Sequence, residues 1–92
     1  MGNSKEKQKI DDSFELKKSD KKALILYNDD YHYFDFVINA LVKVCDHTEI
    51  QAEQCATIVH YKGRCDVKQG QYKQLKPLRE ALVEHGLNAA IE

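Results

Sequence analysis

An excess of charge of either sign is missing from this 92-residue sequence, because 14 lysines and arginines stand against 15 aspartates and glutamates, for a net charge of −1. Such a balance argues against a nucleic-acid or membrane-surface partner, which would attract concentrated positive charge. A long apolar run is missing too: nothing approaches the roughly 18 residues that span a bilayer, and residues 1–5 lack the apolar core of an export signal. We therefore expect a cytoplasmic protein with no nucleic-acid and no membrane partner.

Cysteine is scarce, and its spacing does not fit a metal site. Cys45, Cys55 and Cys65 form an odd number in a sequence without an export signal, which favours reduced thiols that pack as small apolar groups. Together with His47 and His60 they show neither the Cys-x2-Cys nor the His-x3–5-His spacing of a zinc site. Only the convergence of ligands distant in the sequence stays open, and we expect no metal and no cofactor.

No pair of nucleophile and base can be recognised either, since Cys45 and His47 straddle an expected helix end where the geometry cannot be read. Cys55 and His60 are five residues apart on one expected helix, so about 140° separates them around its axis. No motif for an oxyanion hole accompanies them. The adjacent carboxylates Asp29 and Asp30 suit a polar turn with an Asp helix cap. We therefore expect a protein that is not an enzyme, and a small hydrolase is only a distant alternative.

The N-terminal segment has too little apolar surface to fold by itself. Ten of residues 1–20 are charged, and after Met1 the only large apolar residues are Ile10, Phe14 and Leu16. We expect a disordered, charged arm over residues 1–20, which either docks on a partner or only keeps the chain soluble. Residues 21–92 are enough for one compact domain and leave no room for a second.

The compact part begins with a strand pattern and two helix patterns. Residues 22–27 are apolar on both alternate sets, which favours a mostly buried strand. Apolar residues at helical spacing follow from near Tyr33 to Cys45. Thr48 and Gln51 match a reciprocal capping box, so a second helix should begin there.

The second half of the domain repeats the alternation. The second helix should end near Gly63, and residues 65–68 suit a short, weak strand. Leucines at three- and four-residue spacing predict a third helix, in which Pro77 removes an amide, so that regular helix either begins near Gln74 or bends in its first turns. Residues 87–91 suit a last strand.

The order strand, helix, helix, strand, helix, strand has too few uninterrupted βαβ units for a doubly wound sheet. We predict an α+β fold, a β-α-α-β-α-β sandwich in which three helices pack on one face of a small antiparallel three-stranded sheet.

Polar residues with free lone pairs gather where the first strand ends. Asn28-Asp29-Asp30-Tyr31 separates this strand from the first helix, and the solitary His60 lies one helix further on. Amide, carboxylate and neutral imidazole groups can converge on one ammonium group, which has three donors. The sequence therefore predicts a corner that captures a cationic amine.

Three short motifs resemble the ClpS adaptor family: Asn28-Asp29-Asp30-Tyr31, Phe36-Val37-Ile38 and Val59-His60-Tyr61-Lys62-Gly63. The resemblance covers residues 22–64, including the spacing between motifs. Proteins of this family are adaptors that bind N-terminal destabilising residues (N-degrons) of substrate proteins and deliver them to a Clp AAA+ unfoldase for proteolysis. The resemblance thus implies two partners, N-degron substrates and the N-terminal domain of the unfoldase, and likens the charged arm to the extension that engages the unfoldase.

The resemblance also implies a substrate site in two parts. Asn28, Asp29 and His60 resemble the residues that accept hydrogen bonds from the free α-amino group of the substrate. The first side chain of the substrate, expected to be Phe, Tyr, Trp or Leu, would enter a pocket. The residues that resemble the lining of this pocket are His32, Phe34, Ala56, Val59 and Leu87.

The sequence departs from the family at four positions. His32 stands at a common Thr, Tyr33 at a common Pro, and Phe34 and Ala56 each at a common Met. A smaller Ala56 would open the pocket toward β-branched residues, whereas a larger Phe34 would refill it. An alternative from another class is a non-catalytic structural interaction module, since the same sandwich resembles the C-terminal domain of the ribosomal stalk protein. Such a module has no use for three converging acceptors.

Overall fold

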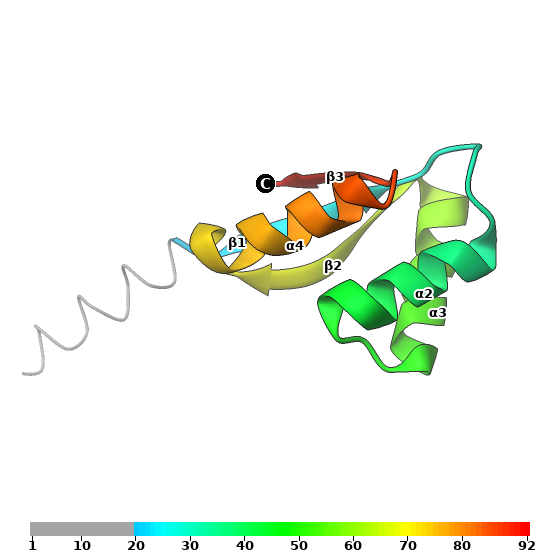
Figure 1. Ribbon diagram of the computed structural model, residues 1–92, viewed down its shortest axis with the longest axis horizontal. Helices are drawn as coiled ribbons and strands as arrows, with labels where there is room; N and C mark the ends of the chain where they lie inside the picture. Colours follow the sequence, from blue (N-terminus) through cyan, green and yellow to red (C-terminus); the bar gives the residue numbers. More distant parts are fainter. Residues whose placement is uncertain (1–19) are drawn as a thin grey trace, which may run out of the picture.

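The computed structural model describes residues 20–92, and the predicted α+β fold is confirmed (Figure 1). All but the last residue of the expected charged arm lies outside the described residues. Within the described part, no helix combines the length and the apolar character that crossing a bilayer requires. The elements follow in the order β1 (Lys22–Tyr27), α2 (Phe34–Cys45), α3 (Glu49–Lys62), β2 (Arg64–Gly70), α4 (Tyr72–Glu84) and β3 (Asn88–Ile91).

The sheet is antiparallel, with β1 between β2 and β3. Leu24 and Leu26, which alternate along β1, point to one face of it, where Val67 of β2 and Ala89 of β3 join them in the core. Figure 1 shows α4 lying over the strands, while α2 and α3 pack against each other beside it. All three helices contribute buried side chains to this one core, among them Leu41, Ala52, Val59, Leu75 and Leu82.

A bulge interrupts the pairing of β1 with β2. Leu24 pairs with Lys68 and Ile25 with Asp66, so that Val67 has no partner of its own on β1. The imidazole of His47, which is only 6% exposed, lies with Nε2 2.6 Å from the carbonyl oxygen of Val67 and donates to it. A side chain from the segment between α2 and α3 therefore satisfies the carbonyl of the bulged residue.

The capping box that the sequence predicts for α3 is present. The Thr48 side-chain oxygen accepts from the backbone N–H of Gln51 at 3.1 Å, and the Gln51 side-chain oxygen accepts from the backbone N–H of Thr48 at 3.2 Å. The helix ends at Gly63, whose φ of 91° is the left-handed conformation that glycine adopts without strain. Both predicted ends of α3 are thus confirmed.

Two elements are longer than their sequence patterns indicated. Strand β2 runs from Arg64 to Gly70, beyond the expected residues 65–68, because its mostly exposed ends still pair with β1. Helix α4 begins at Tyr72 and includes Pro77, whose missing N–H removes a single hydrogen bond from the exposed side of the helix. Pairing and packing sustain both elements where the local pattern is weak.

Candidate amine and side-chain binding site

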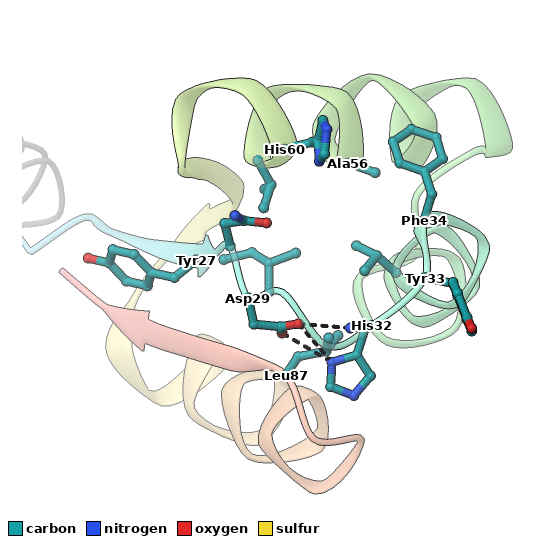
Figure 2. Close-up of a pocket in the computed structure, with 12 residues that line it drawn as sticks. Tyr27, Asp29, His32, Tyr33, Phe34, Ala56, His60 and Leu87 are labelled. Carbon is teal, nitrogen blue, oxygen red and sulfur yellow. Dashed lines mark hydrogen bonds and ion pairs between the residues drawn. The ribbon is translucent and has the colours of Figure 1, made fainter.

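One cavity of about 340 Å³ lies between the end of β1, the loop that follows it, and helices α2 and α3 (Figure 2). All eight residues that the sequence singled out as a site line this cavity. They are Asn28, Asp29, His32, Phe34, Ala56, Val59, His60 and Leu87.

Four lining residues were not anticipated: Leu26, Tyr27, Tyr33 and Val37. Two of them could have been found from periodicity. Leu26 lies two residues before Asn28 on the same side of an extended chain, and Val37 lies one helical turn after Phe34. Tyr27 and Tyr33 border the cavity only because the loop between them curves around it, and neither has a sequence signal.

The ends of β1 and α3 are tied together at the cavity. The backbone N–H of Asn28 donates to the carbonyl oxygen of Gly63 at 2.9 Å. Since Gly63 ends α3, this bond holds the acceptor-rich loop against the last turn of α3, which carries His60. This hydrogen bond thereby brings Asn28 and His60 to the same cavity.

The carboxylate of Asp29 is held by its own loop. Its Oδ1 accepts from the backbone N–H groups of Tyr31 and His32, both at 2.9 Å, which is an Asx-type turn. Both carboxylate oxygens lie 3.1 Å from Nδ1 of His32. Partial burial raises the pKa of Asp29, but these hydrogen bonds and the imidazole outweigh it, so that the pKa lies below its ordinary value. Asp29 is therefore an ionised acceptor at neutral pH.

His60 lies across the cavity from Asp29. Figure 2 shows His60 and Ala56, one turn apart on α3, on the wall opposite the Asp29 loop. The imidazole of His60 is exposed and packs edge-on against Tyr61 with 4.9 Å between ring centroids. A neutral imidazole at this rim offers a nitrogen lone pair to a ligand that enters the cavity.

The interior of the cavity is apolar. Leu26, Ala56, Val59 and Leu87 are all buried within the fold and present carbon atoms to it. Phe34, the first residue of α2, is 41% exposed and rises toward α3 at the edge of the cavity (Figure 2). An apolar interior with ionised and polar groups on its rim can bind a molecule that carries an ammonium group and an apolar side chain on one carbon atom.

His32 contacts the Asp29 carboxylate and contributes little to the apolar interior of the cavity. Its ring points away from the centre of the cavity (Figure 2). It stacks on Phe36, with centroids 4.8 Å apart and an interplanar angle of 20°. It lies beside the Asp29 carboxylate and near Gly86. The expected wall residue thus borders the cavity as a support for its carboxylate.

The remaining chemistry-bearing side chains do not form a reactive centre with this cavity. Within residues 20–92 no three or more His, Cys, Asp or Glu side chains are arranged to hold a metal ion. All three cysteines are free. Burial raises the pKa of Cys45 to about 11, of Cys65 to about 12, and also raises that of Cys55. A raised thiol pKa is the opposite of what an activated nucleophile requires.

Comparison with known proteins gives a family and a fold. The family model for the ATP-dependent Clp protease adaptor protein ClpS matches residues 17–90. A solved structure of ClpS2 from Agrobacterium tumefaciens, bound to L-phenylalaninamide, matches with a TM-score of 0.68 at 23% identity, over 79% of this chain and 95% of that one. The chain is also 29% identical, over 73 residues, to the E3 ubiquitin-protein ligase UBR1 of Homo sapiens and of Mus musculus. That match covers 79% of this chain and 4% of those proteins.

Proposed function

This chain belongs to the ClpS family of Clp protease adaptors, and we propose that it binds proteins by their N-terminal residue and delivers them to a Clp AAA+ unfoldase for degradation. The observation that carries the proposal is the composition of one cavity. Its rim carries an ionised carboxylate and further acceptors, and its interior is apolar. A protein N-terminus with a large apolar first residue has the complementary parts.

The α-ammonium group is the part that fixes the substrate's orientation. Its three N–H donors match the Asn28 side-chain oxygen, the Asp29 carboxylate and a lone pair of the His60 ring, which all border the cavity. An acetylated N-terminus has lost the charge and two of the donors. We therefore expect acetylation to abolish binding.

The first side chain of the substrate would fill the interior of the cavity. Burying a large apolar side chain contributes roughly 1.5 to 3 kcal/mol before ordering costs are subtracted. Phe, Tyr, Trp and Leu suit an opening lined by Ala56, Val59 and Leu87. The phenylalanine derivative bound to the Agrobacterium protein supports a first residue of this kind.

Delivery to the unfoldase is the second part of the proposal. It is supported by membership of a family of adaptors of the ATP-dependent Clp protease. The ligase segments that resemble this chain are a small part of long proteins. The similarity therefore supports a shared module but does not indicate which protein receives the bound substrate.

The test is fluorescence-anisotropy binding with labelled peptides that differ only in their first residue: Phe, Leu, Ile, Ala and N-acetylated Phe. We expect binding of the free Phe and Leu peptides and none of the acetylated peptide. Comparison with Ile measures whether Ala56 admits β-branched residues or Phe34 excludes them. If no peptide binds, the proposal fails, and a structural interaction module with this fold explains the chain better.

A further inference from the structure

The contact between His32 and Asp29 does more than line the cavity. Nδ1 of His32 lies 3.1 Å from both carboxylate oxygens, so this nitrogen carries a proton and donates to Asp29. Oδ1 also accepts two backbone N–H groups, whereas Oδ2 has the imidazole as its partner among the described residues. The lone pairs that Oδ2 keeps are the ones available to an ammonium group.

The fold holds the His32 ring in this position. One face stacks on Phe36 of α2, and the edge of Tyr31 lies 5.7 Å away, between ring centroids. On the side of the turn after α4, a Cβ atom at Gly86 would stand only 3.1 Å from Nε2 of His32, so glycine there leaves the ring its space. Gly86 has a φ of 88°, and both its conformation and its lack of a side chain suit this contact. The side chain of His32 is 19% exposed and has little freedom to turn away from Asp29.

Two charge states of this pair present different sites to a substrate. With a neutral imidazole, Asp29 receives one hydrogen bond from the ring in addition to the two from the backbone, and it keeps its full negative charge for the ammonium group. With an imidazolium, the pair has no net charge, and two cations compete for one carboxylate. Binding and protonation are thermodynamically linked. If the imidazolium weakens substrate binding by some factor, bound substrate weakens protonation of the imidazole by the same factor.

We propose that His32 is a positioning residue for Asp29 that makes capture of the N-terminal ammonium group depend on pH, with tight binding when its ring is neutral and weaker binding when it is protonated. The inference rests on the proposed function. The charged and titratable groups around the ring are few. Asp29 and the phenol ring of Tyr31 face it from the loop. Phe36, which faces it from α2, is uncharged, and His85 lies near Phe36 with 6.3 Å between their ring centroids. His60 borders the cavity from α3.

The test compares the wild-type chain with His32→Asn. The Asn amide can donate to Asp29 from nearly the place of Nδ1, but it does not titrate. Calorimetry of a Phe-initiated peptide at pH 6, in two buffers of different ionisation enthalpy, counts the protons released on binding. We expect His32→Asn to release fewer protons than the wild-type chain. We also expect the affinity of His32→Asn to fall less than that of the wild-type chain from pH 8 to 5.5. The difference in affinity should grow by up to about tenfold for each pH unit over which the wild-type ring takes up its proton.

His85→Asn is the matched control, because His85 is exposed, donates to the carbonyl oxygen of Ala81 and does not line the cavity. It should leave affinity, proton release and the pH profile unchanged. His60 is present in all of these proteins, so the difference between the wild-type chain and His32→Asn isolates His32.

The outcomes separate this inference from the proposed function. Binding of the free-amine peptide with equal proton release and equal pH profiles in both proteins would overturn the role of His32 and leave the adaptor intact. Absence of peptide binding by the wild-type chain would overturn both. If His32→Asn does not fold, an NMR titration of the wild-type ring decides: the peptide should move protonation of His32 to lower pH, and an unmoved titration would contradict the inference.

Discussion

At the scale of the residue, the Asp29 carboxylate orders its own loop, and we propose that it also binds the ammonium group of the substrate. Its Oδ1 organises the loop through two backbone hydrogen bonds, and the charge that remains faces the cavity. Because its pKa in the folded chain is lowered, the charged form stabilises the fold. That stability is present above the unfolded value of about 3.9 and is lost as the pH falls through the lower folded value. Over the range in which histidines titrate, Asp29 stays ionised.

Replacing Asp29 by Asn should separate these roles. The amide oxygen can still accept from the backbone of the loop, but the negative charge that we propose binds the ammonium group is gone. We expect binding of a Phe-initiated peptide to weaken by about 1.5 to 3 kcal/mol, the scale of a hydrogen bond to a charged group. Fluorescence anisotropy measures it, with a thermal melt to show that the fold persists.

Asp30→Asn is the matched control, because Asp30 is the exposed neighbour and does not line the cavity. An equal loss of affinity in both variants would mean that general negative charge, and not Asp29, attracts the peptide.

The second residue-scale prediction concerns the size of the cavity. Ala56 is buried and lines it, so Ala56→Met should place a longer side chain in the space that the first residue of the substrate would occupy. Overpacking of this kind typically costs about 1 to 3 kcal/mol. We expect weaker binding of a Trp-initiated peptide by that amount and a smaller loss for Leu.

Thr57→Met serves as the control for Ala56→Met, since Thr57 is exposed on the same helix and absent from the lining. If Ala56→Met bound Trp and Leu peptides as the wild-type chain does, the assignment of the interior as the side-chain pocket would be wrong.

At the scale of the element, the bulge in β2 depends on a residue from outside the sheet. His47 donates to the carbonyl oxygen of Val67, and both residues are buried. Within the described residues, Nδ1 of His47 is the one buried side-chain nitrogen or oxygen without a hydrogen-bond partner. The imidazole therefore forms a hydrogen bond to β2 through Nε2 alone.

Removing this donor should destabilise the fold. His47→Leu keeps an apolar side chain of similar bulk but leaves the Val67 carbonyl unsatisfied. The usual cost is about 1 to 3 kcal/mol in the free energy of unfolding, measured by urea denaturation. The exposed His85→Leu should change it little, and equal stability of both variants would show that the bulge carbonyl finds another donor.

At the scale of the whole molecule, the three free cysteines lie on three different elements and pack in or against the same core. Cys45 ends α2, Cys55 lies within α3 and Cys65 within β2, and all belong to or border the one core. Burial raises the pKa of Cys45 to about 11 and that of Cys65 to about 12. Because the folded values are raised, the protonated thiols favour the fold. Their contribution is fully present below the unfolded value of about 8.5 and is lost as the pH rises through the folded values.

The reactivity of these thiols should therefore report on the whole fold. At pH 8 we expect iodoacetamide to label all three cysteines much more slowly in the native chain than in urea, because burial limits both access and the thiolate fraction. Mass spectrometry of peptides after timed labelling measures each site. Equal native and denatured rates at Cys65 would show that β2 opens readily and that its raised pKa has no protective effect.

The local parts of the fold could be predicted because their causes are local. A capping box of Thr48 with Gln51 and a glycine at position 63 define the ends of α3 within the sequence itself. The length of β2 could not be predicted, since its exposed residues gain their hydrogen bonds from β1, which lies far away in the chain. A helix start before Pro77 was predicted near Gln74, and only the first two residues of α4, from Tyr72, were missed.

The sequence by itself determined the order of elements, the polar loop after the first strand and the motifs that mark the family, because these depend on residue type and short spacing. The family resemblance implied that Asn28, His60 and Leu87 share a site, but only the tertiary structure decided how these separate segments border one cavity. It also decided that His32 supports Asp29 and stacks on Phe36. These are matters of distance and direction between residues far apart in the chain, which packing of the helices on the sheet sets and residue spacing does not encode.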